Sequence, residues 1–294
     1  MLSVKPSGAR TNANAMNFAR RGAAARVLIL FTTVAAALTW GSARAQNDPS
    51  TVWQALRFQL FGADEIRSDT AGQVITLNVP DRAMDASVVP VGIEGRLLRD
   101  DSRRIERIWL VIDGNPSPLA AEFRFMQLSA RADIETRVRI DKPGQVRAIA
   151  RLSDGSLHQA AHHVQASGGC SVPMNKDPDR QAPDYGDVRL RLRGTPVQGE
   201  PLLAQLMVRH PNSSGFAINP STQQPQSAHF VRHFSVRYGN AAVLEADIDF
   251  SISENPNFRF WVMPEGDGEM SVRVVDSDDR QFAQTMMIRP RMAD

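Results

Sequence analysis

The sequence contains a single cysteine, Cys170, among 294 residues. An internal disulfide is therefore excluded, because it needs two thiols. Aromatic residues make up 6% of the chain, too few to supply the basic and aromatic platform typical of proteins that bind single-stranded nucleic acid. The formal net charge of +2 is close to neutral and predicts no strong attraction to nucleic acid or to an anionic membrane.

The common catalytic signatures are also missing. The sequence has no Gly-x-Ser-x-Gly nucleophile motif, no phosphate-binding glycine loop and no His-Glu-x-x-His metal motif. His158 and His162 share one face of an expected strand, and His210, His229 and His233 could meet only through folding. We therefore predict no catalytic residues, no metal site and no cofactor, with an enzyme whose active site is hidden as an alternative.

No apolar run reaches the about 20 residues that a membrane-spanning helix needs. The apolar stretch 27–40 follows Arg20, Arg21 and Arg26, and it precedes Ala43-Arg44-Ala45, the pattern of an export signal and its cleavage site. We predict a signal peptide over 1–45 and a periplasmic protein with no stable membrane insertion after cleavage. An uncleaved anchor is the alternative, and the choice between general and twin-arginine export stays open.

Hydrophobic periodicity predicts an almost entirely β structure. Apolar residues spaced by about four over Thr51–Phe61 indicate one short helix that ends at Gly62. Period-two patterns then recur with turn residues between them, which is typical of β-sandwiches. Strands are expected at Val74–Val79, Val88–Leu98, Ile105–Ile112, Glu122–Met126, Ile134–Ile140, Val146–Leu152, His158–Val164, Val188–Arg193, Leu202–Val208, Phe230–Tyr238, Val243–Ile248, Phe258–Val262, Met270–Val275 and Phe282–Ile288.

A polar, proline-containing stretch separates two groups of strands. This predicts two β-sandwich domains, over 46–170 and 188–294, joined by a linker over 171–187. The alternation over Ile134–Ile140 places Arg139 on a polar face with Glu135 and Arg137.

Charged residues also form two stripes in the second half of the chain. Arg189, Arg191 and Arg193 line one face of a strand and form either a solvated surface or a docking surface for an acidic partner. Glu245, Asp247 and Asp249 form an acidic stripe that could pair across a sheet.

The lone thiol lies in Ser167-Gly168-Gly169-Cys170-Ser171. Glycine has wide backbone freedom, so the flanking Gly168 and Gly169 predict a mobile, accessible thiol on a short arm that also includes Ser171. A small buried hydrophobe in a strand is the alternative. An unpaired cysteine in an exported protein indicates a free thiol with a function or an intermolecular disulfide.

The ordered motifs of the chain resemble those of the SoxYZ sulfur carriers. The first half resembles SoxY in Ile-Trp-Leu-Val-Ile-Asp-Gly-Asn-Pro-Ser-Pro-Leu-Ala at 108–120, Thr-Arg-Val-Arg at 136–139, Val-Arg-Ala-Ile-Ala at 146–150 and Gly-Gly-Cys at 168–170. The second half resembles SoxZ in His210-Pro211, Ala-His-Phe-Val at 228–231, Val-Leu-Glu-Ala-Asp at 243–247, Ser-Glu-Asn-Pro at 253–256 and Phe-Arg-Phe at 258–260. More narrowly, the chain looks like the fused carriers associated with quinoprotein dehydrogenases.

This resemblance implies immunoglobulin-like sandwich domains and a non-catalytic periplasmic carrier. Cys170 is then the covalent attachment site for a sulfur-containing group, and Gly168 and Gly169 form the arm. The partners are then oxidoreductases such as c-type cytochromes or a quinoprotein dehydrogenase, in a pathway like thiosulfate oxidation. Ser171 and Val172 stand where the family has two further glycines, and the chain continues into the second half, so the arm is tethered.

Two other functions remain open on sequence grounds. One is a non-covalent accessory protein that docks to a periplasmic quinoprotein dehydrogenase. The other is a thiol redox protein or a disulfide-linked dimer through Cys170.

Overall fold

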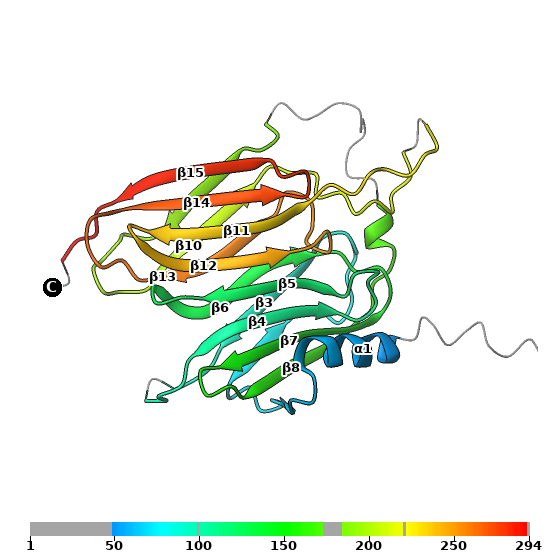
Figure 1. Cartoon of the computed structure of the whole chain (residues 1–294), viewed down its shortest axis with the longest axis horizontal. Coiled ribbons are helices and arrows are strands. Elements are labelled where there is room, and N and C mark those ends of the chain that lie inside the picture. The colour runs from blue at the N-terminus through cyan, green and yellow to red at the C-terminus, as the bar shows by residue number, and fades with distance from the viewer. Residues whose placement is uncertain (1–48, 99, 173–183, 220–221, 293–294) are drawn as a thin grey trace, which may run out of the picture. The chain divides into compact units, whose positions relative to one another are not determined.

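The structure, a computed structural model, describes residues 49–98, 100–172, 184–219 and 222–292. The predicted signal peptide over 1–45 lies outside these residues, as does 173–183 of the predicted linker. Figure 1 shows a sandwich of two sheets with one helix, α1 (Pro49–Phe61), against it. The helix ends at Gly62, whose φ of 58° lies in the left-handed region, as the sequence predicts.

Strands in the described part of the chain form a nine-stranded and a six-stranded sheet. The nine-stranded sheet has the order β1-β8-β7-β4-β5-β12-β11-β14-β15. Its strands are β1 (Ile66–Ser68), β4 (Ile105–Ile112), β5 (Leu119–Phe125), β7 (Gly144–Leu152), β8 (Leu157–Val164), β11 (Val231–Tyr238), β12 (Ala241–Ile248), β14 (Gly268–Asp276) and β15 (Gln281–Ile288).

The six-stranded sheet has the order β2-β3-β6-β13-β10-β9. Its strands are β2 (Ile75–Asn78), β3 (Val89–Gly95), β6 (Ser129–Val138), β9 (Val188–Arg193), β10 (Leu202–Val208) and β13 (Asn257–Val262). The all-β sandwich prediction is confirmed, and β4, β9 and β10 have the predicted bounds. The three-residue β1 was not predicted, because so short a segment shows no clear periodicity.

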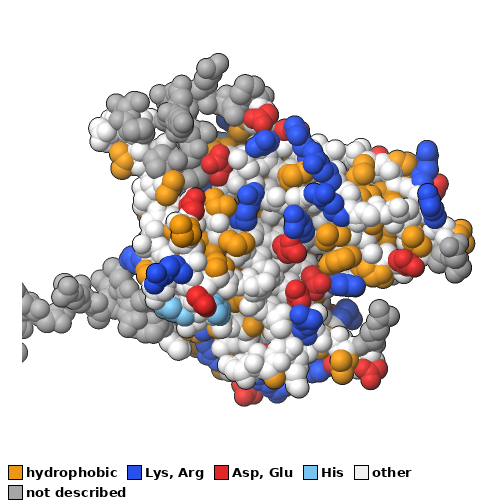
Figure 2. All heavy atoms as spheres, turned by 180° about the vertical axis from the view of Figure 1, so that it is seen from behind, with side chains coloured by type: hydrophobic (Ala, Val, Ile, Leu, Met, Phe, Trp, Pro, Cys, Tyr) orange, Lys and Arg blue, Asp and Glu red, His pale blue; other side chains and the backbone are white. Residues whose placement is uncertain are grey.

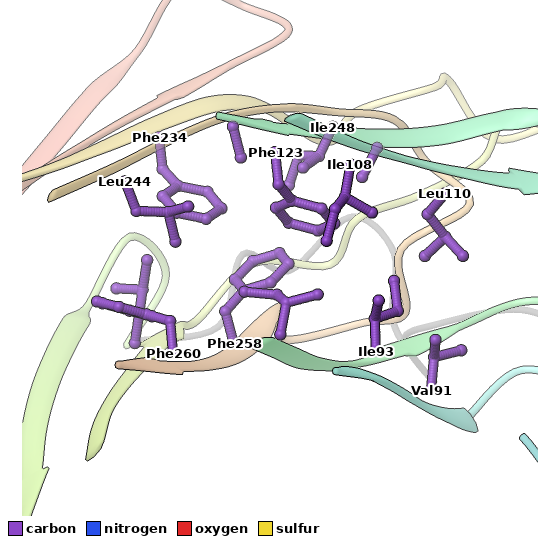
Figure 3. Packing of buried hydrophobic residues seen from close by; sticks show 14 of the residues in the cluster. Val91, Ile93, Ile108, Leu110, Phe123, Phe234, Leu244, Ile248, Phe258 and Phe260 are labelled. Atoms are coloured by element: carbon purple, nitrogen blue, oxygen red, sulfur yellow. The ribbon is translucent and has the colours of Figure 1, made fainter. Parts of the chain in front are cut away.

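Two strand pairs join the halves of the chain edge to edge. In the nine-stranded sheet β5 pairs with β12, and in the six-stranded sheet β6 pairs with β13, both antiparallel. One core therefore runs through both halves, and Figure 3 shows Phe123 of the first half beside Phe234 and Phe258 of the second. The Phe123 and Phe258 ring centroids are 6.1 Å apart in an edge-to-face arrangement.

The helix α1 covers part of the outer face of the nine-stranded sheet. Trp53 and Phe61 of the helix pack against Trp109, Ile149 and Leu157 in a second buried cluster. The described residues contain no helix with the length and apolar character that crossing a membrane requires.

Candidate functional site

Cys170 lies in a one-turn 3-10 helix, Gly169–Ser171, that follows β8. The Gly168 N–H donates to the Asp141 carbonyl at 2.8 Å, and the Gly169 N–H donates to the Ile140 carbonyl at 2.9 Å. Gly168 has a φ of 81°, a conformation that side-chain-bearing residues rarely adopt. The segment predicted to be a mobile arm is thus a hydrogen-bonded turn against the end of β6 in this structure.

Gly169 fits its place only because it has no side chain. A Cβ atom on Gly169 would lie 2.1 Å from the Ala86 carbonyl oxygen and 2.8 Å from the Ile140 carbonyl oxygen. Both distances are far inside van der Waals contact. By contrast, a Cβ atom on Gly168 would meet no atom within 4 Å. The two glycines therefore have different roles: Gly168 supplies the bend, and Gly169 permits the close approach.

The prediction of an accessible thiol is wrong for this structure, because Cys170 is only 1% exposed. The alternative of a cysteine inside a strand does not hold either, because the residue lies in a turn. The Cys170 carbonyl accepts a hydrogen bond from the hydroxyl of Ser214, in the second half of the chain. Ser171 and Val172, which follow, are exposed. The glycines that suggested freedom instead allow the turn to pack closely.

The surroundings of the thiol favour its protonated form. Burial, and then the nearby carboxylate of Asp141, raise the pKa of Cys170 to about 12, although the charge of Arg139 opposes this shift. Thiolate is the reactive form of cysteine, so the buried thiol is chemically quiet. Attack on another sulfur therefore requires the turn to open.

Arg139 is a charged group close enough to the thiol to affect its pKa, and it is fully buried. One guanidinium nitrogen, Nη1, donates to the carbonyls of Phe250 at 2.6 Å and Ile252 at 2.8 Å. Burial lowers the pKa of Arg139 to about 10. The predicted placement of Arg139 on a polar face is wrong, because β6 ends at Val138 and the strand alternation ends with it.

The raised pKa of Cys170 predicts a loss of stability in alkali. An unfolded thiol ionises near pH 8.5 to 9, whereas the folded thiol has a pKa of about 12. The unfolded state loses its proton first, so the free energy of unfolding falls as pH rises through this window, by up to about 1.4 kcal/mol per pH unit. In urea titrations, we expect the unmodified protein to lose more stability than Cys170→Ser between about pH 8 and pH 10. Equal losses in the two proteins would contradict the raised pKa.

A second polar cluster lies in the second half of the chain. His229 Nε2 is 3.0 Å from Asp276 Oδ2, and His210 Nε2 is 3.6 Å from the same oxygen. The Tyr185 hydroxyl donates to Asp276 Oδ2 at 2.8 Å. Burial opposes ionisation of Asp276, but hydrogen bonds from His229 and Tyr185 outweigh it and lower its pKa to about 2. His233, the third histidine that folding could have brought to this place, does not join the cluster. It contacts Asp247 instead.

The tautomer of His210 decides the chemistry of this cluster. Its Nδ1 accepts a hydrogen bond from the Asn212 N–H at 3.0 Å, so the proton of the neutral ring lies on Nε2, the atom that faces Asp276. A metal ligand must present a lone pair, and ligating imidazoles usually donate through their other nitrogen. Burial, and then the neighbouring His229, lower the pKa of His210 to about 4, so the ring is neutral. We assign Tyr185, His229 and Asp276 to a hydrogen-bonded cluster, with His210 Nε2 buried beside it at 3.6 Å from the Asp276 carboxylate.

The cluster and the thiol are connected through one short segment. His210 begins the segment in the cluster, and Ser214 ends it at the Cys170 carbonyl. Between them, Ser213 exchanges two backbone hydrogen bonds with His229, at 2.7 and 3.0 Å. Sequence reasoning missed Ser214, Tyr185 and Asp276, because nothing in their local sequence distinguishes them from ordinary loop and strand residues.

Comparison with protein families accounts for both halves of the chain. The family model described as "Sulfur oxidation protein SoxY" matches residues 57–170, and the one described as "Sulphur oxidation protein SoxZ" matches residues 190–287. The chain belongs to the SoxYZ-like proteins, with both parts fused in one polypeptide. The SoxY match ends at Cys170, so the thiol stands at the end of the SoxY part. No curated protein matches the chain.

Solved structures show only remote likeness. A superoxide reductase (neelaredoxin) from Ignicoccus hospitalis is 15% identical, with a TM-score of 0.30, over 34% of this chain and 93% of that chain. A glycosyl hydrolase family 2 member from Bacteroides cellulosilyticus is 12% identical, with a TM-score of 0.21, over 72% of this chain and 28% of that one. Neither likeness is close enough to support an argument about function.

Proposed function

We propose that this SoxYZ-like protein is a periplasmic carrier that holds a sulfur-containing group covalently on Cys170 and presents it to partner oxidoreductases. The supporting observation is that the only cysteine of the sequence stands at the end of the SoxY match. The two families supply the role in sulfur oxidation. The export pattern before residue 46 supports a periplasmic location. Disulfides form in that oxidising compartment, but a lone thiol has no second cysteine in its own chain with which to pair.

The packing around Cys170 supports a two-state carrier. In the closed state described above, the buried thiol is protonated and shielded from stray oxidants. Within the described residues, opening breaks the hydrogen bonds of the Gly168 and Gly169 N–H groups to the carbonyls of 141 and 140 and the hydrogen bond of the Ser214 hydroxyl. Each neutral hydrogen bond contributes about 1 kcal/mol net, so opening of this turn alone costs far less than global unfolding.

Loading and release of the group can be written with balanced electrons. In loading, the Cys170 thiol and a second S–H group each lose a proton, an S–S bond forms, and two electrons pass to the partner, either one to each of two haems or both to one quinone cofactor. In release, a partner thiolate attacks the outer sulfur, the S–S bond breaks, and Cys170 leaves as a thiolate. The second step needs no oxidant. A c-type cytochrome or a quinoprotein dehydrogenase has the cofactor that the first step requires.

Intact-mass measurement tests the carrier function. Protein purified from cells that oxidise reduced sulfur compounds is expected to carry an adduct that a thiol reductant removes. The Cys170→Ser variant is expected to show the unmodified mass, because no other thiol exists in the sequence. A Cys170 thiol that stays unmodified under all growth conditions would argue against the carrier function.

The same variant separates the carrier from a non-covalent accessory protein of a quinoprotein dehydrogenase. A carrier loses its function in Cys170→Ser, whereas an accessory protein that acts by docking keeps it. The measurement is sulfur-compound oxidation in a strain that makes only the variant chain. Full activity in Cys170→Ser would favour the accessory role.

A further inference from the structure

The outer face of the six-stranded sheet is rich in arginine. We call this surface the arginine face, defined by Arg131 and Arg137 on β6, Arg259 on β13, and Arg189, Arg191 and Arg193 on β9. Three carboxylates lie among them, those of Glu94, Asp133 and Glu135. Figure 2 looks onto the side of the molecule opposite to Figure 1 and shows basic and hydrophobic side chains side by side. The face therefore carries an excess of positive charge.

The arginine stripe of β9 is not neutralised by its neighbouring strand. Arg193, Arg191 and Arg189 lie opposite Leu203, Gln205 and Met207 of β10, none of which is charged. Arg189 pairs with Asp187 at 2.7 Å, but Arg191 has no ion-pair partner within the described residues. Because β9 is an edge strand of its sheet, no second strand of the described part of the chain pairs with it to bring carboxylates.

The acidic stripe on the other sheet shows the opposite arrangement. Asp247 of β12 lies 2.8 Å from Arg124 of β5 and 2.8 Å from His233 of β11. Glu245 lies 3.7 Å from the same arginine. Asp249, the third residue of that stripe, accepts a hydrogen bond from the Ser117 hydroxyl. The sequence predicts that the acidic stripe could pair across a sheet, and this pairing accounts for Glu245 and Asp247. It does not account for the arginine stripe of β9.

Apolar side chains lie within the arginine face. Trp261 of β13 is half-buried, with Leu203 of β10 opposite it on one side and Arg131 of β6 on the other. The Arg131 guanidinium stacks over the Trp261 ring at 4.4 Å, a geometry that fixes both side chains. A hollow of about 600 Å³ on this face is lined by these three residues together with Arg137 and Arg259. Tryptophan and arginine are the residues that most often dominate binding energy in protein interfaces.

We propose that the arginine face docks a folded protein partner through an acidic patch on that partner. Arginine binds carboxylates bidentately, and the apolar residues between the arginines supply area that a partner can desolvate. Glu94 pairs with Arg96 and Glu135 pairs with Arg259, so the positive charge of this face is interrupted and does not match the uniform phosphates of a nucleic acid or an anionic membrane. A protein partner can place its carboxylates opposite the arginines that remain unpaired among the described residues.

A second copy of the chain fits this face poorly. A two-fold contact places the same patch on both subunits, so arginines would meet arginines. Edge-to-edge strand pairing through β9 is also hindered, because the Leu190 N–H already donates to the Gln284 side chain of β15.

The arginine face extends to the end of the sandwich that holds the thiol. Arg137 is on this face. Three residues later in the chain, the Ile140 carbonyl accepts the hydrogen bond from the Gly169 N–H. A partner seated over Arg137 and Arg189 therefore stands beside the Cys170 turn. The docking surface does not include Cys170 itself, so it is independent of the proposed carrier chemistry.

Charge reversal tests this surface with poly-L-glutamate as the probe. We expect salt-sensitive binding of fluorescent poly-L-glutamate that Arg191→Glu/Arg193→Glu weakens about tenfold, because two attractions become two repulsions. The matched control is Arg273→Glu, an exposed arginine on β14 of the other sheet, which should leave binding unchanged. Equal weakening by the control, or no binding at low salt, would overturn the proposal. Cys170→Ser is expected to bind as the unmodified chain does.

A photo-crosslinking residue in place of Leu203 then identifies the natural partner in cells that produce the full chain. Support requires two properties of the captured protein once it is purified. Its contact surface is rich in carboxylates, and it binds the Arg191→Glu/Arg193→Glu variant more weakly than the unmodified chain. Tighter binding of a DNA duplex or of phosphatidylglycerol vesicles than of poly-L-glutamate would overturn the proposal. So would light scattering that shows a dimer which the charge reversal dissociates.

Discussion

Gly169→Ala is expected to release the Cys170 thiol. The new methyl group would lie 2.1 Å from the Ala86 carbonyl oxygen, and that oxygen is held in place by the Ile140 N–H at 2.8 Å. Overpacking of this kind costs about 1–3 kcal/mol, so the population with an open turn rises by a factor of about 5 to 160. The measurement is the rate at which iodoacetamide alkylates Cys170 at fixed pH.

Gly168→Ala is the matched control in the same turn. Its methyl group would meet no atom within 4 Å, and the substitution costs only the strain of a φ of 81°, about 1 kcal/mol. We therefore expect a smaller rise in alkylation than in Gly169→Ala. Circular dichroism should show that both variants keep their β-sheet content. Similar rates in the two variants would mean that close packing at Gly169 does not hold the turn closed.

Arg139→Met is expected to lower the free energy of unfolding by about 3 kcal/mol, because two buried carbonyls lose their charged donor. Those carbonyls, of Phe250 and Ile252, belong to the SoxZ part, whereas Arg139 belongs to the SoxY part. The substitution therefore weakens the join between the halves. The measurement is the urea midpoint at neutral pH, with the alkylation rate of Cys170 as a second readout.

Arg137→Met is the control for that experiment, because Arg137 lies two residues earlier on the half-buried outer face of β6. Its loss is expected to stay within about 0.5 kcal/mol, as for most surface substitutions. Arg139→Lys is expected to fall between the two, because lysine keeps one donor but not the planar fork. A midpoint for Arg139→Met equal to that of Arg137→Met would show that the buried guanidinium does not join the halves.

Gly169→Ala and Arg139→Met both probe the packing around Cys170. The turn that holds Cys170 packs against residues 86 and 140–141 of the SoxY part and against Ser214 of the SoxZ part. Arg139 interacts electrostatically with Cys170 and donates hydrogen bonds to the SoxZ loop 250–252. A fused chain keeps these groups at a fixed effective concentration, so closing of the turn does not depend on protein concentration.

Strand positions were predictable because they depend on local pattern. Val188–Arg193 and Leu202–Val208 alternate so regularly that side-chain period and turn residues locate them within a residue. The pairing of β5 with β12 and of β6 with β13 was not predictable, because strand order depends on contacts between residues more than one hundred positions apart. Period-two alternation says which face a residue lies on, but not which strand lies beside it.

The single thiol, the glycines before it and the two β-rich halves around it could all be predicted, because composition and short-range periodicity carry that information. The burial of Cys170, its interaction with Arg139, and the meeting of His210, His229 and Asp276 could not be predicted, because they depend on contacts between residues far apart in the chain. Glycine permits both a free arm and a tight turn, so its local sequence cannot distinguish them. The carbonyls of Ala86 and Ile140, brought together by the sandwich, select the tight turn.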